Sequence, residues 1–275
     1  MPTIIVCTNF SDTLGNALKY ACSLISSKVN PEEISILLLN VYTIPVTYSG
    51  DGIALVTINN ALNDAEEELH AELEWAYEEY PKLNIIGKVT TGRFIDALRE
   101  EADEIEASLV IMGTGGYYGE LWSWDENILN ALRDLSVPVL TIPPDISFRT
   151  LLNIAFACNI KNVNLSTSIN TIKNLINFTD SHLHVVYVTN QQIKPGSTEA
   201  ANEAMLHAGL NELSPTYHTL WENEIVGAIG RFVEDKQIQL LLVMPRRHGV
   251  WENLFYKSYT KEPAKINYLP IMSLH

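Results

Sequence analysis

The clearest chemical pattern in the sequence is the segment GTGGYYGELWSWDEN, residues 113–127. Gly113 and Gly116 directly follow an apolar run, as glycines do in loops whose backbone N–H groups approach a phosphate. The segment ends in Asp125 and Glu126, whose negative charges would repel a phosphate. The loop therefore holds a nucleotide, derives from a loop that held one, or is only a turn.

Two common nucleotide motifs do not fit the glycines. The dinucleotide fingerprint G-x-G-x-x-G would need a glycine at position 118, which is Tyr118, and it would follow the first strand of a domain. A G-x-x-x-x-G-K-[ST] phosphate loop occurs nowhere in the sequence. The sequence therefore predicts neither a dinucleotide enzyme nor a phosphate-loop NTPase.

Hydrolase and metal chemistry also lack their residues. The hydroxyls of Thr114 and Ser123 have no histidine near them in sequence, and no G-x-S-x-G segment exists. The seven histidines are scattered, and none has metal-ligand spacing with cysteine or carboxylate. His182 and His184 alternate along a predicted strand, so one of them is expected to face solvent. We expect no enzyme activity, no metal and no cofactor.

A second loop, near residue 250, gathers positive charge. Arg246, Arg247, His248, Lys257 and Lys261 lie around the start of a predicted helix. Such side chains could hold an anion without help from the backbone. The favoured alternative is an ordinary basic surface, or salt bridges to the acidic first half.

Large aromatic residues flank both loops. They are either core residues, which is the favoured reading, or anchors of a protein interface. These residues are Tyr117, Tyr118, Trp122, Trp124, Trp251, Phe255 and Tyr256.

The charge of the chain is unevenly distributed. The net charge is −15, and residues 1–150 hold 8 Lys and Arg against 23 Asp and Glu, whereas residues 151–275 hold 10 of each. An acidic first half argues against nucleic acid or an anionic membrane as a partner. Most of the excess lies in 64–79 and 100–106, which we interpret as solvated helix faces.

The composition is typical of a globular protein. The 275 residues are 47% hydrophobic and 19% charged, enough for one large or two ordinary domains. No apolar run is long enough to cross a membrane, and the first residues do not resemble a signal peptide. Cys7, Cys22 and Cys158 lie in apolar runs and are expected to be buried, reduced thiols. The expected location is the cytoplasm.

Hydrophobic periodicity repeats one order of elements twice. The first half predicts strands at 3–7, 34–41, 84–90, 108–112 and 138–142, with helices after residue 11 and near 59–80, 93–106 and 125–135. The second half predicts strands at 153–157, 183–188, 216–221, 239–244 and 270–274, with helices near 164–177, 198–209 and 224–236. This alternation predicts an α/β fold of two tandem doubly wound domains, 1–145 and 149–275, joined by a Pro-containing linker.

Each domain is expected to be a five-stranded parallel sheet in the order 3-2-1-4-5. Ligands of such sheets bind beyond the carboxyl ends of the strands, where the strand order reverses. That place brings together Asn9, Val41 and the loop after Met112.

The chain resembles the universal stress protein family. The resemblance is carried by MGTGG after the fourth strand and PVLTIP at the last strand of the first half. The segments VMPRRHGVWENLFYKSYT and LPIMSLH resemble the divergent second domain of tandem members. The resemblance covers nearly the whole chain and implies that strands 138–142 and 270–274 pair, which would make one chain a pseudo-dimer.

The ATP-binding branch of that family carries G-x-x-G, nine residues, then G-[ST], and an aspartate after the first strand. Gly113 and Gly116 match the first glycines, and Asn9 replaces the aspartate. Glu126 and Asn127 replace the last pair or, after a one-residue deletion, Asp125 and Glu126 do. The resemblance thus implies a vestigial nucleotide site. Its candidate residues are Asn9, Val41, Gly113, Thr114, Gly116 and Asn127.

In the second half the matching glycine positions fall at Met244, Arg247 and Lys257, and only Ser258 is kept. A candidate anion site there consists of Arg246, Arg247, Lys257 and Ser258. ATP or AMP binding is disfavoured in both halves, because side chains at former glycines block the approach of a phosphate to the backbone.

The expected function is that of a non-enzymatic stress-response protein that acts through contacts with an unknown protein partner, with no nucleic acid or membrane involved. The alternative is a protein that binds an adenine nucleotide or another anion through altered contacts. A homodimer in addition to the pseudo-dimer stays open.

Overall fold

The computed structural model describes residues 2–11, 15–42, 52–114, 122–158, 165–189, 196–221, 225–244 and 269–274, with the backbone alone described at 52–58, 122–125 and 165–167. The chain divides into two compact units, Met1–Phe148 and Arg149–His275, which we call unit 1 and unit 2. In each unit, strands alternate with helices along the chain. In the described part of the chain, no helix combines the length and the apolar character that crossing a membrane requires.

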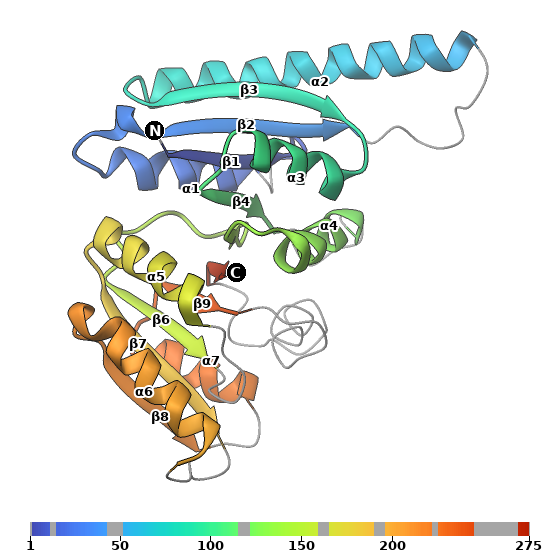
Figure 1. The fold of residues 1–275 in the computed structure, drawn as a ribbon. Coiled ribbons are helices and arrows are strands. Elements are labelled where there is room, and N and C mark those ends of the chain that lie inside the picture. Colours follow the sequence, from blue (N-terminus) through green and yellow to red (C-terminus); the bar gives the residue numbers. More distant parts are fainter. Residues whose placement is uncertain are drawn as a thin grey trace. The chain divides into compact units, whose positions relative to one another are not determined.

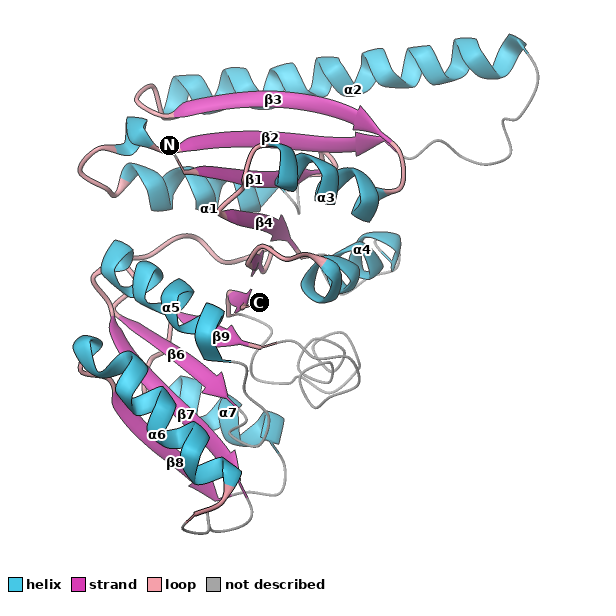
Figure 2. Cartoon of the chain, in the orientation of Figure 1, coloured by secondary structure: helices cyan, strands magenta, loops and turns pink. Residues whose placement is uncertain are grey.

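The described residues of unit 1 form a parallel sheet in the order β3-β2-β1-β4-β5, which confirms the predicted 3-2-1-4-5 order. Its strands are β1 (Thr3–Thr8), β2 (Ser35–Tyr42), β3 (Asn84–Thr91), β4 (Leu109–Gly113) and β5 (Val139–Ile142). Its helices are α1 (Gly15–Ser26), α2 (Gly52–Glu79), α3 (Phe94–Glu104) and α4 (Trp122–Asp134), with a 3-10 turn at Pro31–Glu33. Figure 2 shows β1, β2 and β3 with their arrowheads at one edge of the sheet.

The described residues of unit 2 repeat this arrangement in the order β8-β7-β6-β9-β10. Its strands are β6 (Asn153–Cys158), β7 (His182–Thr189), β8 (Thr216–Trp221), β9 (Leu240–Val243) and β10 (Ile271–Ser273). Its helices are α5 (Leu165–Thr179), α6 (Thr198–Leu210) and α7 (Ile225–Asp235), with a 3-10 turn at Asn211–Leu213. The segment that connects β9 to β10 includes 245–268, outside the described residues.

The helices of unit 1 cover both faces of its sheet. Helix α1 packs on β1, β4 and β5, and α2 packs on β2 and β3, whereas α3 and α4 pack together on the opposite face. Strands β1 and β2 are buried along most of their length between these layers, as continuous apolar runs predict. The edge strand β3 is more exposed. Cys7, Cys22 and Cys158 are buried and unpaired, as predicted, and burial raises the pKa of each thiol.

Helix α2 begins seven residues earlier than the predicted start at residue 59. The β-branched run near 56–58 favours a strand locally, so periodicity alone did not extend the helix to Gly52. Its 28 residues span about 42 Å, whereas the eight residues of β3 span about 26 Å. Helix α2 therefore continues past the carboxyl ends of the strands on which it packs (Figure 1).

Candidate functional site

The predicted site residues of unit 1 meet at one edge of the sheet. Cys7 pairs with Leu39 in β2 and with Met112 in β4, so the three strands end side by side. We call this place the carboxyl edge of unit 1, and it consists of Thr8, Asn9, Val41, Gly113 and Thr114. Gly116 lies outside the described residues, and Asn127 lies half-buried in the second turn of α4.

The turn after β1 uses the side chain of Asn9 for its own structure. The Asn9 Oδ1 atom accepts hydrogen bonds from Ser11 N at 3.1 Å and from Ser11 Oγ at 2.8 Å. Asn side chains commonly close turns in this way. Between them, Phe10 has φ 63°, a left-handed conformation that is uncommon for an aromatic residue. The amide oxygen of Asn9 is therefore already engaged within the turn.

A carboxylate reaches the same edge from α2. Thr8 Oγ1 donates a hydrogen bond to Glu72 Oε1 at 3.3 Å, and it accepts one from Phe10 N at 3.0 Å. The other oxygen, Glu72 Oε2, is buried and has no hydrogen-bond partner among the described residues. Burial raises the pKa of Glu72; the Thr8 hydrogen bond lowers it, and the charge of Glu68 raises it further. Glu72 thus places an acidic group beside the end of β1.

Sequence reasoning missed Glu72 because it interpreted 64–79 as a solvated face. That interpretation is wrong at Glu72, and for 100–106 it is wrong at Glu101, which is 6% exposed and forms an ion pair with Lys88. The available signal was the spacing of residues along α2. Steps of three and four residues place Glu72 on the same face of the helix as its buried apolar residues. The stripe consists of Ala65, Leu69, Glu72 and Ala76.

The backbone at the end of β4 is committed to the sheet. Thr114 N donates to Ile142 O at 2.8 Å, and so extends the pairing of β4 with β5. Next to β1, Asn40 Nδ2 donates to Thr8 O at 3.0 Å in a buried position. A phosphate loop offers free N–H groups at this point, and Thr114 does not offer one.

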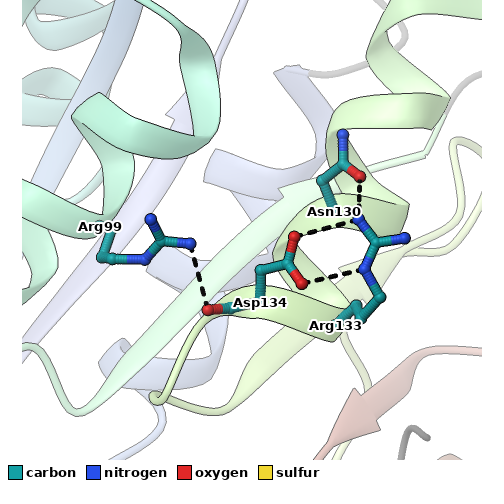
Figure 3. A network of polar contacts seen from close by, with 4 residues as sticks. All are labelled: Arg99, Asn130, Arg133 and Asp134. Carbon is teal, nitrogen blue, oxygen red and sulfur yellow. Dashed lines mark hydrogen bonds and ion pairs between the residues drawn. The ribbon is translucent and has the colours of Figure 1, made fainter. Parts of the chain in front are cut away.

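Two arginines of unit 1 are engaged at the last turn of α4 (Figure 3). Arg133 binds both carboxylate oxygens of Asp134, at 2.9 and 3.0 Å, and also Asn130 Oδ1 at 2.7 Å. Arg99 Nη2 donates to the backbone oxygen of Asp134 at 3.4 Å and so joins α3 to α4. Because α4 runs antiparallel to the strands, its last turn lies at the amino edge of the sheet. These cations therefore do not serve the carboxyl edge.

The candidate anion residues of unit 2, Arg246, Arg247, Lys257 and Ser258, lie outside the described residues. Near the end of β6 lies a buried polar group, the hydroxyl of Tyr187. Cys158, the last residue of β6, pairs with Tyr187. The Tyr187 hydroxyl is buried and has no hydrogen-bond partner among the described residues. Burial raises the pKa of Tyr187, and the charges of Cys158, Tyr217 and Glu203 raise it further.

Histidines line the face of the unit 2 sheet opposite to the one that carries Tyr187. His184 Nδ1 lies 3.0 Å from His218 Nε2, and His184 Nε2 lies 3.4 Å from Asn153 Oδ1. Since Asn153 Oδ1 can only accept, neutral His184 donates from Nε2 and accepts at Nδ1 from His218. His182 is exposed and His184 is 9% exposed, which confirms that one of the two faces solvent. Among the described residues no group of three or more potential ligands is arranged to hold a metal.

Comparisons with known proteins agree with this fold. A model of the universal stress protein family matches residues 1–143. A universal stress protein from Archaeoglobus fulgidus is 15% identical with a TM-score of 0.65, over 98% of this chain and 95% of that chain. A Pseudomonas aeruginosa protein provisionally named a universal stress protein is 15% identical with a TM-score of 0.54, over 100% of this chain and 93% of that one.

The same architecture also occurs in a protein of another kind. The cytoplasmic domain of a prokaryotic cation chloride cotransporter is 11% identical with a TM-score of 0.54, over 99% of this chain and 95% of that chain. At these identities the likeness concerns the fold. A comparison with curated proteins found no match to the chain.

Proposed function

The chain belongs to the universal stress protein family, and from this premise we propose that it is a non-enzymatic, cytoplasmic stress-response protein that acts through contacts with another protein. In this proposal the nucleotide site of unit 1 is vestigial, and the chain needs no cofactor. The observation that carries the proposal is the state of the carboxyl edge. There Glu72 places a carboxyl group, the Asn9 side chain is bonded within its own turn, and Thr114 N, the first N–H after β4, is bonded to β5.

Two contacts and one negative charge support the loss of nucleotide binding. The Asn9 oxygen is bound by Ser11 and is not free to accept from a ligand hydroxyl. Thr114 N is bound to Ile142 O and is not free to donate to a phosphate. In its ionised form Glu72 adds repulsion, since a carboxylate about 4 Å from a phosphate charge costs about 1 kcal/mol in water and more when partly buried.

Calorimetric titration of the full chain with ATP and magnesium tests this proposal. We expect no heat beyond dilution, because Thr114 N is already bonded to Ile142 O and none of the five residues that define the edge carries a positive side chain. A saturable heat with one nucleotide per chain or per unit would overturn the vestigial site.

The second candidate is anion binding by the basic segment of unit 2. It is favoured by the concentration of Arg246, Arg247 and Lys257 in a half that is neutral overall. Titration with inorganic phosphate and with AMP tests it, with Arg247→Glu as the matched variant. Heat that Arg247→Glu removes supports this candidate, whereas its absence from the wild-type chain excludes it.

The assembly that we propose follows from the family resemblance alone. Strands 138–142 and 270–274 would pair within one chain, which protects two sheet edges from unwanted association. Pairs of introduced cysteines, one in each segment, would test the pairing by disulfide formation at different registers. Crosslinking that depends on the strand register supports the pseudo-dimer, and crosslinking in no register contradicts it.

A further inference from the structure

A chain of hydrogen bonds connects the middle of α2 to the turn that follows β1. Glu72 Oε1 accepts from Thr8 Oγ1, and the same Thr8 Oγ1 accepts from Phe10 N. A hydroxyl donates one hydrogen bond and can accept others, so Thr8 serves both neighbours at once. Phe10 has a φ of 63°, a conformation that a non-glycine residue keeps only where its surroundings hold it.

We propose that Glu72 is a positioning residue that acts as a proton-responsive latch: its carboxyl holds the turn after β1 through Thr8, and loss of its proton releases that turn. The turn lies at the carboxyl edge, where folds of this kind present their ligands and contacts. Proton uptake at Glu72 would therefore set the shape of that edge. The proposal is independent of whether any nucleotide binds.

The unpaired oxygen is the reason for the proton dependence. Glu72 Oε2 is buried without a partner in the part of the chain that the structure describes. A buried polar atom that lacks a hydrogen bond is costly, above all when it is charged. In the neutral form Thr8 keeps its acceptor on Oε1, and no charge is desolvated. In the ionised form the Thr8 hydrogen bond is stronger, but burial opposes the charge and is the larger influence on the pKa. Movement of the ionised side chain to water, which would hydrate both oxygens, is the response that the latch requires.

The charged groups around Glu72 act in the same direction. On its own helix, the charge of Glu68 raises the pKa of Glu72. From α1, Lys19 lies over the ring of Trp75 at 5.5 Å, and from β3, Lys88 is paired with Glu101 of α3 on the other face of the sheet. From β1, Thr8 contributes only its hydroxyl. None of the cations named here is therefore paired with the ionised form.

Unit 2 offers an internal contrast. The last residue of its first strand is Cys158, in the place that Thr8 occupies in unit 1. Glu203 of α6 lies near enough for its charge to raise the pKa of Cys158, but a buried thiol is a weak donor. Among the described residues, the hydroxyl link between a helix and the end of the first strand is found in unit 1.

Amide hydrogen exchange at Phe10 tests the latch in the full-length chain. The exchange rate is measured across pH in the wild type, in Glu72→Gln and in Glu72→Ala, with Glu66→Gln as the control on the exposed face of α2. Glu72→Gln keeps an oxygen acceptor for Thr8 and cannot ionise. The ratio of wild-type to Glu72→Gln rates cancels the intrinsic dependence of exchange on pH.

We expect this ratio to be near one at acidic pH and to rise by about tenfold as the pH passes the pKa of Glu72, since opening frees the amide. Glu72→Ala should exchange fast at every pH, whereas Glu66→Gln should follow the wild type. A carbon-13 titration of the Glu72 carboxyl should give the same midpoint. A ratio that stays near one throughout, or a Glu72→Gln chain as unprotected as Glu72→Ala, overturns the latch.

Discussion

Units 1 and 2 share one strand order, yet they bury ionisable groups of opposite kind on opposite faces. Unit 1 buries the carboxyl of Glu72 beside the carboxyl ends of its strands, and its pKa is raised. Unit 2 buries the imidazole of His184 against α7, where His184 and His218 both contact Phe232. Burial, together with nearby positive groups, lowers the pKa of His184 to about 4.

The contrast has a consequence for the dependence of stability on pH. A group whose pKa is raised in the folded state favours folding below its unfolded pKa, and this contribution is lost as the pH rises through the folded pKa. A histidine whose pKa is lowered contributes stability above its unfolded pKa and loses it as the pH falls. Glu72 and His184 therefore make the two units respond to pH in opposite directions.

The largest expected effect tests whether each unit depends on a core of its own. Phe156 of β6 is fully buried, so Phe156→Ala should destabilise unit 2 by about 3–5 kcal/mol through lost contacts and a cavity. Hydrogen exchange of β7 amides measures the loss, and exchange of β2 amides monitors unit 1. An equal loss of amide protection in β2 would show that the two units unfold together. The two units could then not be compared as independent structures.

The next effect concerns the histidines of unit 2. The unfolded pKa is 6.5 and the folded pKa of His184 is about 4, so stability should be full above pH 6.5 and fall between pH 6.5 and 4. His182, His218 and Lys236 oppose the proton, and we expect a loss of about 2 kcal/mol after allowance for solvent screening. Protection of β7 amides should follow this curve.

His184→Gln supplies the control for that titration. It removes the titrating ring, so the loss of protection below pH 6.5 should shrink by more than half, with the remainder due to His218. A wild-type chain whose β7 protection is constant from pH 7 to about 4.5 would contradict the assigned neutral histidine pair.

A smaller effect tests how unit 1 treats its buried carboxylates. Glu101 is buried and paired with Lys88, so Lys88→Met should cost about 1–2 kcal/mol because a desolvated charge loses its partner. The double variant with Glu101→Gln should recover most of that loss in urea denaturation. Asp96→Asn, at an exposed pair with Arg93, should cost under about 0.5 kcal/mol.

The smallest effect concerns Thr8. Thr8→Val keeps the shape of the side chain and removes the hydroxyl, which should cost about 1 kcal/mol for the loss of two hydrogen bonds. Glu72→Gln should instead raise the melting temperature at neutral pH, because it removes the carboxyl whose ionisation the folded state disfavours. A lower melting temperature for Glu72→Gln would show that the ionised carboxylate is stabilising.

Much of the fold could be predicted from the sequence because its signals are local. The continuous apolar runs at β2 and β7 indicate strands covered on both faces, and the repeated order of elements indicates two sheets of one topology. The place of Asn9 and Val41 at one edge then follows from the strand order. These predictions needed no knowledge of side-chain contacts.

The chemistry of the edge could not be predicted in the same way, because it depends on contacts between distant residues. Glu72 and Thr8 are 64 positions apart, and one glutamate among many on α2 gives no sign of which one turns inward. The pairing of His184 with His218 likewise needs the register of β7 with β8. The left-handed conformation of Phe10 could not be predicted from its residue type, because such conformations favour glycine and asparagine.

The central claim is that the carboxyl edge of unit 1 keeps the fold of a nucleotide site without its binding chemistry. The most direct test is a nitrogen-15 NMR titration of the full chain with ATP and magnesium, observed at the amides of Asn9, Gly113 and Thr114. The account predicts that these resonances stay in place at millimolar ATP. Saturable shifts at all three amides, absent with magnesium alone, would contradict it.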